Sequence, residues 1–289
     1  MNIKTFFLLA AFLCLSDTIL SQTDSLISRK ERRKQRPTYF ILSSGLSSGS
    51  FRDFATSPLV YSGIGLNSFG VRNRVDERRE SELGLSYTLG GYSAGSSENT
   101  TTASVQTFRF FYRQLYQIRR FSSEKWNLKA GGQLNFAANI RQNFFLLNNS
   151  VGIEFFPTVF GSVKLTRDVS RKKEKRGKFL LFNYHLKPRK RELSFRFDAG
   201  LVNSTYRNGF VYIGQSFLLN EFDLFDGYEF KIFSGLRLNT ALDYTRYLKN
   251  GNAMRWSYTW ELFRTAQTPD RFEMGLHSIR FALLFNTKP

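Results

Sequence analysis

Cysteine, histidine and long apolar runs are scarce in this sequence. Its one cysteine, Cys14, lies near the N-terminus, and the chain has only 2 His and 6 Pro residues. No run of 18 apolar residues occurs, which excludes a helical membrane protein because a spanning helix needs ~20. If the N-terminal segment is cleaved, the mature chain can form no disulfide, so core burial or membrane insertion must stabilise it.

The N-terminal segment has the pattern of a secretory signal. Lys4 is followed by the apolar run 6–15 (FFLLAAFLCL). This run is too short to span a bilayer but has the length of a signal h-region. We predict a signal peptide over residues 1–21, cleaved after Ser21. A retained anchor, or a lipoprotein modified at Cys14, are the alternatives that the sequence leaves open.

Aromatic residues are abundant although the chain is not hydrophobic on average. There are 31 Phe, 13 Tyr and 3 Trp residues, yet the mean hydropathy is −0.32. Strands whose residues alternate between lipid and water produce this combination. The excess of Gly (21) over Pro (6) also suits long strands that bend in places.

Two segments show strict alternation of apolar and polar residues. Over 126–141 one face carries Trp126, Leu128, Ala130, Gly132, Leu134, Phe136, Ala138 and Ile140, and the other is mostly polar. The segment 228–244 has the same period of two. Both exceed the ~5–6 residues of an average soluble strand and satisfy the ~9–11 of a membrane-crossing strand. We therefore predict an all-β, antiparallel, up-and-down transmembrane β-barrel rather than a soluble β-sandwich.

The expected number of strands is about twelve, with ten and fourteen left open. We place strands near 38–50, 58–71, 81–94, 103–116, 125–140, 149–166, 178–186, 191–205, 209–219, 228–247, 253–266 and 271–286. Turn residues separate them at 206–209, 249–252 and 268–270. Pro157 predicts a bulge or local break within the sixth strand. The domain plan is a basic periplasmic segment over 22–37, a barrel over 38–286 and a short tail over 287–289.

The last predicted strand carries an alternating apolar pattern. Ile279, Phe281, Leu283 and Phe285 share one face, and four polar or terminal residues, 286–289, follow. This resembles the C-terminal signal of outer-membrane β-barrel proteins, which usually end at the aromatic residue. With the signal peptide and the long aromatic strands, the mature chain resembles barrel proteins of the Bacteroidota type. The resemblance implies location in the cell outer membrane and contact with the barrel-assembly machinery, membrane lipid and lipopolysaccharide, but no specific activity.

Basic residues exceed acidic ones by 42 to 23 and cluster at 29–36, 171–176 and 187–191. Such an excess favours nucleic-acid binding in a cytosolic protein, but export and the lack of a recognition motif argue against a nucleic-acid partner. We interpret the clusters as solvated turns beside an anionic membrane, with lipopolysaccharide phosphates or an anionic envelope protein as alternative partners. The predicted strand order places 29–36 and 168–177 on the periplasmic side and 187–191 on the outer side.

The inward faces of the predicted strands carry charges of both signs. The lumen-facing candidates are Lys129, Arg141, Arg196, Asp198, Lys231, Arg237, Asp243, Arg255, Glu261 and Arg280. In a narrow barrel these side chains either interlock as ion-paired filling or line a small, anion-favouring pore. The sequence leaves both arrangements open.

No catalytic, metal or cofactor motif is found. The histidines are His185 and His277, and Ser278 follows His277 directly. Adjacent residues of a strand point to opposite faces, so this pair cannot act as base and nucleophile. No His/Cys/Asp cluster has metal-ligand spacing. We predict a non-enzymatic protein, with a narrow pore or transporter ranked just above a non-conducting structural or assembly component that binds envelope proteins, and a membrane-embedded lipid hydrolase far behind.

Overall fold

The computed structural model describes most of the chain after residue 35. The described residues are 36–95, 100–146, 151–179, 182–208, 225, 228–266 and 271–287. The predicted signal peptide 1–21, nearly all of the basic segment 22–37, and the predicted strand 209–219 lie outside them. Among the described residues, no helix has the length and apolar character needed to span a bilayer.

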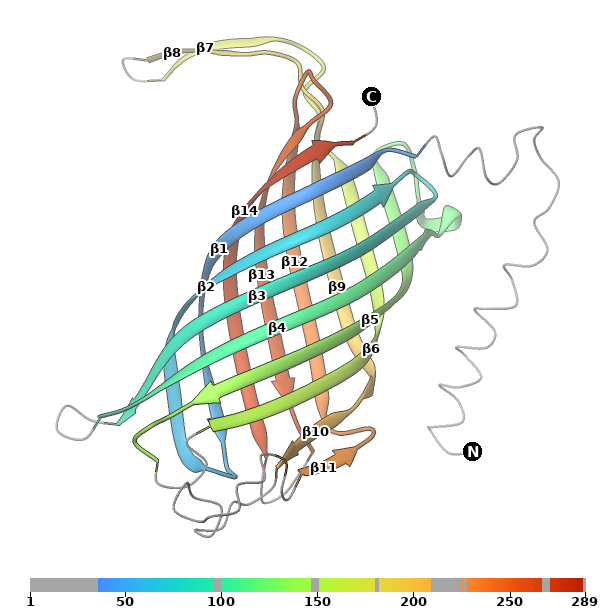
Figure 1. The fold of residues 1–289 in the computed structure, drawn as a ribbon. Coiled ribbons are helices and arrows are strands. Elements are labelled where there is room, and N and C mark those ends of the chain that lie inside the picture. The colour runs from blue at the N-terminus through green and yellow to red at the C-terminus, as the bar shows by residue number, and fades with distance from the viewer. Residues whose placement is uncertain are drawn as a thin grey trace, which may run out of the picture. The chain divides into compact units, whose positions relative to one another are not determined.

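Ten long antiparallel strands close into a barrel (Figure 1). They are β1 (Thr38–Asp53), β2 (Ser57–Val75), β3 (Arg79–Gly95), β4 (Thr100–Gln117), β5 (Trp126–Gln142), β6 (Val151–Asp168), β9 (Arg191–Asn203), β12 (Leu236–Tyr247), β13 (Ala253–Arg264) and β14 (Phe272–Asn286). Each strand pairs with its neighbours in the chain, β1 pairs with β14, and pairing of β6 with β9 completes the ring. The strands have 12 to 19 residues, enough to cross a membrane when tilted. The predicted all-β, up-and-down class is confirmed.

The predicted number of about twelve strands is corrected to ten. The segment 178–186 does not cross the barrel, because β7 (Lys175–Phe179) and β8 (Phe182–Leu186) pair with each other in a separate two-stranded sheet. Strands of five residues are too short to span the hydrocarbon core, and this hairpin is rich in Lys and Arg.

The predicted strand 228–247 is two strands. β11 (Tyr228–Lys231) pairs with β10 (Thr205–Asn208) beside the ring, and β12 begins only at Leu236. Between them the backbone turns through Phe233, with φ 57°, and Gly235, with φ 80°. Positive φ values do not continue a strand, so the alternating sequence runs on while the strand stops.

The barrel has two distinct ends. We call the end where β1 starts and β14 finishes the terminus end, and the opposite one the loop end. Because 178–186 does not cross, β6 leaves and β9 enters at the terminus end, where Arg171 and Arg189 exchange backbone hydrogen bonds of 3.0 and 3.1 Å. The prediction that 187–191 lies on the opposite side from 168–177 was therefore wrong.

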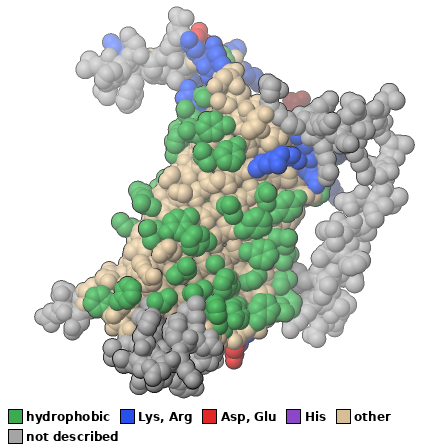
Figure 2. Space-filling view, in the orientation of Figure 1, with side chains coloured by type: hydrophobic (Ala, Val, Ile, Leu, Met, Phe, Trp, Pro, Cys, Tyr) green, Lys and Arg blue, Asp and Glu red, His purple; other side chains and the backbone are tan. Residues whose placement is uncertain are grey.

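Side-chain burial is inverted relative to a soluble protein. On β5 the polar Lys129, Gln133 and Asn139 are buried inside the barrel, whereas Leu134 and Phe136 on its outer face are 46% and 52% exposed. Figure 2 shows hydrophobic side chains spread over the outer wall. An apolar exterior around a polar interior is the arrangement that a lipid bilayer stabilises.

Pro157 lies where β6 changes partners. Thr158 and later residues of β6 pair with β9, whereas Phe155 pairs with Tyr206 of β10, and the β6–β9 register shifts between Val159 and Phe160. The strand itself is continuous through Pro157. A residue without an N–H is least disruptive at such a junction. The predicted irregularity is thus a change of pairing rather than a break of the strand.

The predicted turn 249–252 joins β12 to β13. Leu248 N–H donates to the carbonyl of Asn252 at 2.7 Å, and Gly251 has φ 80°. Only glycine adopts this conformation readily, so the sequence signal for this turn was accurate.

The separate pairing of β7 with β8 generates a prediction. Replacing residues 173–187 by a short Gly-Ser linker should preserve the barrel, because the bridge between Arg171 and Arg189 still closes the connection. We expect the free energy of unfolding to change by less than about 0.5 kcal/mol. Heat-modifiable migration on gels and urea unfolding in vesicles measure this. Loss of the compact, heat-modifiable form would show instead that the hairpin stabilises the barrel.

Candidate functional site: the barrel lumen

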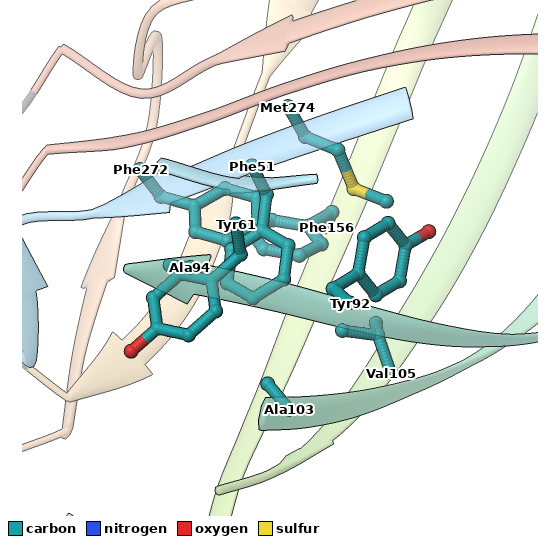
Figure 3. Close-up of a cluster of buried hydrophobic side chains, with 9 residues drawn as sticks. All are labelled: Phe51, Tyr61, Tyr92, Ala94, Ala103, Val105, Phe156, Phe272 and Met274. Atoms are coloured by element: carbon teal, nitrogen blue, oxygen red, sulfur yellow. The ribbon is translucent and has the colours of Figure 1, made fainter. Parts of the chain in front are cut away.

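An aromatic cluster fills the lumen near the loop end (Figure 3). We call it the aromatic plug; its members are Phe51, Tyr61, Tyr92, Ala94, Ala103, Val105, Phe156, Phe272 and Met274. Phe51 stacks on Tyr61 with ring centroids 5.0 Å apart and meets Tyr92 edge-on at 5.2 Å. These residues occupy inward positions of six different strands, so the plug ties opposite walls of the barrel together.

A buried ion cluster lies beside the plug. Asp53, at the end of β1, accepts a hydrogen bond from Arg207 of β10 at 2.7 Å, and its other carboxylate oxygen lies 2.6 Å from the guanidinium of Arg141 of β5. Glu154 of β6 lies 3.6 Å from each of the two arginines. All four residues are almost completely buried. Since a buried charge is costly without a partner, this cluster holds β10 against the barrel although β10 is not part of the ring.

One ion pair crosses the middle of the lumen. Arg109 of β4 donates two hydrogen bonds to Glu261 of β13, at 2.9 and 2.7 Å. These strands are five positions apart in the ring of ten, and therefore stand on opposite walls. Both side chains are 21% exposed, to the lumen. We call this bidentate pair the crossbar; its fork geometry is the strongest that Arg and a carboxylate form.

The crossbar separates two small cavities. Phe69, Arg109, Asn239 and Glu261 line both of them. The cavity toward the loop end has a volume of about 80 Å³ and is lined mainly by Asn, Thr and aromatic residues. The one toward the terminus end measures about 90 Å³ and is lined by five arginines; we call it the basic cavity. Cavities of this size hold a few water molecules, not an open channel.

Further ion pairs close the lumen toward the terminus end. Glu80 lies 2.6 Å from the ammonium of Lys164 and 3.5 Å from that of Lys129. Arg113 bonds to Glu82 on the adjacent strand and lies 3.6 Å from Asp198. At the same end a second apolar cluster packs across the interior. Its members are Tyr39, Ile41, Val71, Phe111, Ala253, Ala282 and Leu284. Inward side chains of the described residues thus meet across the lumen near both ends of the barrel.

The structure places nine of the ten lumen-facing candidates inside the ring. They are Lys129, Arg141, Arg196, Asp198, Arg237, Asp243, Arg255, Glu261 and Arg280. Lys231 instead lies on β11, outside the ring, and pairs with Glu229 at 2.8 Å. Arg237 is bonded to the carbonyls of Pro157 at 2.9 Å and Ser204 at 2.5 Å.

Eight lumenal charges are absent from the sequence-based set. They are Asp53, Glu80, Glu82, Arg109, Arg113, Glu154, Lys164 and Arg207. All but Arg207, on β10, share the inward parity of their strands, so alternation within each strand could have found them. Most of them supply the partners that make the lumen a closed network rather than a charged lining.

The C-terminal signal residues and His277 face outward. Ile279, Phe281, Leu283 and Phe285 are exposed on the lipid side of β14. His277 is exposed on the same face, and its Nδ1 lies 2.7 Å from the Tyr258 hydroxyl. Ser278 lines the lumenal cavity near the loop end, on the other face. The described residues contain no group of three side chains that could bind a metal ion. The side chain of His185 is not among those that the structure describes.

A large hollow lies on the outer wall. It has a volume of about 900 Å³ and crosses β14 and β1 to β6 at mid-strand. Small residues such as Ser44, Ser68 and Gly70 form its floor, and Phe108, Phe136 and other aromatic residues form its sides. Because this surface faces the hydrocarbon core, lipid chains rather than aqueous solutes fill it.

Comparison with family models and with curated proteins gives no match. Three solved structures resemble the fold. The outer membrane protease OmpT from Escherichia coli superposes with a TM-score of 0.50 at 8% identity, over 87% of this chain and 97% of that chain. The autotransporter NalP translocator domain from Neisseria meningitidis gives 0.39 at 10% identity, over 98% and 96%. Neisserial surface protein A gives 0.33 at 9% identity, over 85% and 97%.

At these identities the likeness concerns the fold alone. The closed barrel and its lipid-facing wall nevertheless decide the location. The protein is an outer-membrane β-barrel.

The crossbar generates a prediction about this outer-membrane barrel. Glu261→Gln or Arg109→Met should each lower the free energy of unfolding by about 2–4 kcal/mol, because each leaves a charge unpaired in the lumen. The double variant should lose less than the sum, with a coupling of about 1–3 kcal/mol. Urea unfolding in phospholipid vesicles measures the cycle.

A surface pair supplies the control for that cycle. Arg264 and Glu273 lie 3.4 Å apart, with side chains 54% and 33% exposed, so Arg264→Met and Glu273→Gln should couple by less than about 1 kcal/mol. A crossbar coupling no larger than this value would contradict the view that the crossbar holds the two walls together.

Proposed function

We propose that this protein is a closed, non-conducting outer-membrane barrel that anchors a basic surface in the periplasm and binds an acidic envelope partner there. The observation that carries the proposal is the filled lumen. The aromatic plug, the crossbar and the buried ion pairs occupy the lumen, and the two cavities beside the crossbar measure about 80 and 90 Å³. The proposal therefore ranks the non-conducting component above the narrow pore, which reverses the order that the sequence suggested.

The distribution of charge supports the second half of the proposal. By sequence, the four connections at the terminus end contain 14 basic and 4 acidic residues, and the five at the loop end contain 3 basic and 6 acidic residues. The connection 169–190 alone contributes nine Lys and Arg residues against one Glu. Charge gathered at one end attracts a partner of opposite sign and orients its approach.

The basic surface has a definite place in the fold. Exposed residues of the connection, including Lys172 and Lys173, border an open hollow of about 530 Å³ lined by residues 169–174 and Arg191. The even strand number puts both termini at one end, which is the periplasmic end in bacterial barrels. The proposal includes export by the signal peptide 1–21, a barrel of the Bacteroidota type, and recognition of Ile279, Phe281, Leu283 and Phe285 by the assembly machinery.

A gated narrow pore for small anions is the second candidate. Its support is that two polar cavities face each other across one crossbar. Opening would have to part Arg109 from Glu261 and also displace the aromatic plug. The second requirement separates many packed aromatic contacts, which is why we rank the closed barrel first.

Planar-bilayer recording distinguishes the two candidates. We expect the refolded mature protein to be folded and silent across salt gradients, and Glu261→Gln to remain silent because the plug still closes the loop end. Arg264→Met is the control for insertion without a lumenal change. Steady, anion-selective openings in the wild type, or openings created by Glu261→Gln, would replace the closed barrel by the gated pore.

Binding of an acidic polypeptide tests the basic surface. The full chain in detergent micelles should bind fluorescent polyglutamate with an affinity that falls steeply with salt. Replacing Lys172, Lys173 and Lys187 by Glu should weaken polyglutamate binding by about tenfold or more. Fluorescence anisotropy measures the affinity. The control reverses Arg119, Arg120 and Lys125, which lie at the same end but outside the connection.

Each outcome of the binding experiment bears on the proposal. If the control variant loses less affinity for polyglutamate than the variant at Lys172, Lys173 and Lys187, the binding surface is centred on 169–190. Equal losses would assign binding to the overall charge of the terminus end. Binding to phosphatidylglycerol vesicles with none to polyglutamate would replace the protein partner by the membrane leaflet.

A further inference from the structure

We propose that the basic cavity is a binding site for one small inorganic anion of the size of chloride or nitrate, held by Arg280 and Thr259. The cavity lies inside the barrel between the crossbar and the ion pairs of the terminus end. The proposal is independent of the basic surface and of any acidic partner.

The cavity is enclosed by side chains from most of the ring. Arginines reach it from β4, β9, β13 and β14: they are Arg109, Arg113, Arg196, Arg255 and Arg280. Neutral donors Gln133, Asn239, Ser257 and Thr259 complete the polar part of its wall. A pocket rich in guanidinium, amide and hydroxyl donors is suited to an anion rather than a cation.

The charges around the cavity do not balance. Five arginines line it, but only three carboxylates do, those of Glu82, Asp243 and Glu261. Asp198, just behind the wall, pairs with Arg196 at 3.1 Å and Arg113 at 3.6 Å. One positive charge remains without a matching carboxylate. In a narrow interior surrounded by lipid an uncompensated charge is costly, and one monovalent anion neutralises it.

Arg280 is the arginine of the cavity with neither a carboxylate nor a hydroxyl partner among the described residues. Its guanidinium makes no hydrogen bond or ion pair with any described residue and lies 4.1 Å from the centre of the Phe69 ring. The other four arginines of the cavity each bond to a carboxylate or a hydroxyl. An arginine with five donors and no acceptor beside a lumenal cavity is the group that an anion would satisfy.

Thr259 provides a second, independent sign of a missing ligand. It is 4% exposed, lines the cavity, and its hydroxyl has no hydrogen-bond partner. It lies on β13 diagonally opposite Arg280 of β14, since Thr259 pairs with Ser278 and Ser257 pairs with Arg280. Diagonal neighbours on one face are ~7–8 Å apart, so one small ion can touch both side chains.

The volume of the cavity limits the size of its ligand. About 90 Å³ accommodates a halide or nitrate together with a water molecule or two, but not a six-carbon acid such as gluconate. The crossbar and the aromatic residue Phe69 form the boundary with the other cavity. Chloride and gluconate are therefore a suitable pair of probes, because they share a charge and differ in size.

Thermal unfolding in different salts tests the proposal. The full chain is refolded in detergent micelles in sodium chloride, sodium nitrate or sodium gluconate at equal ionic strength. The midpoint should rise with chloride or nitrate, but not with gluconate, along a saturating curve that gives an apparent Kd. Arg280→Gln should abolish this difference, and Thr259→Val should raise the Kd by about threefold to tenfold.

The control and the alternative variant keep the test decisive. Arg246→Gln removes an exposed arginine from the outer face of β12 and should retain the full chloride effect. If Arg280→Gln does not fold, Arg280→Lys takes its place and should raise the Kd by about tenfold, because the guanidinium fork is lost. Equal midpoints of the wild type in chloride and gluconate, or an unchanged Kd in both Thr259→Val and the folded Arg280 variant, would overturn the site.

Discussion

In a closed barrel of ten strands, alternation forces every second side chain into a narrow interior, and the lipid outside accepts almost no charge. Charged residues at inward positions must therefore find partners across the lumen. The crossbar of Arg109 and Glu261 satisfies this constraint across the full width of the lumen, since it joins opposite walls. The ion pairs around Asp53 and Glu80 do the same between closer strands. Among the described residues, ion pairs and two apolar clusters of inward side chains fill the lumen together.

Alternation in the sequence was sufficient to predict the class of fold but not the number of strands. The run 126–141 alternates because both its faces have a fixed environment along the whole length of β5. The run 228–247 alternates equally well, yet Phe233 and Gly235 turn the backbone between two strands. Periodicity records which face a residue occupies, and contains no information about a local φ value. The predicted strand 178–186 shows the same limit, because Phe182, Tyr184 and Leu186 alternate with polar residues in a strand of only five residues.

The interior site was harder to predict because its geometry is long-range. Single inward charges are visible in one strand at a time, and nine of the ten candidates do point into the ring. Their pairing depends on ring order and shear, which bring together residues as distant as Arg109 and Glu261, 152 positions apart. A ring of twelve strands would have placed β4 and β13 differently. The sequence-based ranking of a pore rested instead on the polarity of the inward faces, which a network of paired charges also produces.

The anion site and the closed barrel are consistent for a physical reason. Conduction needs sites that bind an ion weakly enough to release it to the next one. The basic cavity is small, is bounded by the crossbar, and presents Arg280 and Thr259 without other partners. The net positive wall would retain an anion there rather than pass it on. Departure of the anion would restore an uncompensated charge in a medium of low dielectric constant. The same arginines that resemble a selectivity lining in the sequence would then stabilise the barrel by trapping their counter-ion.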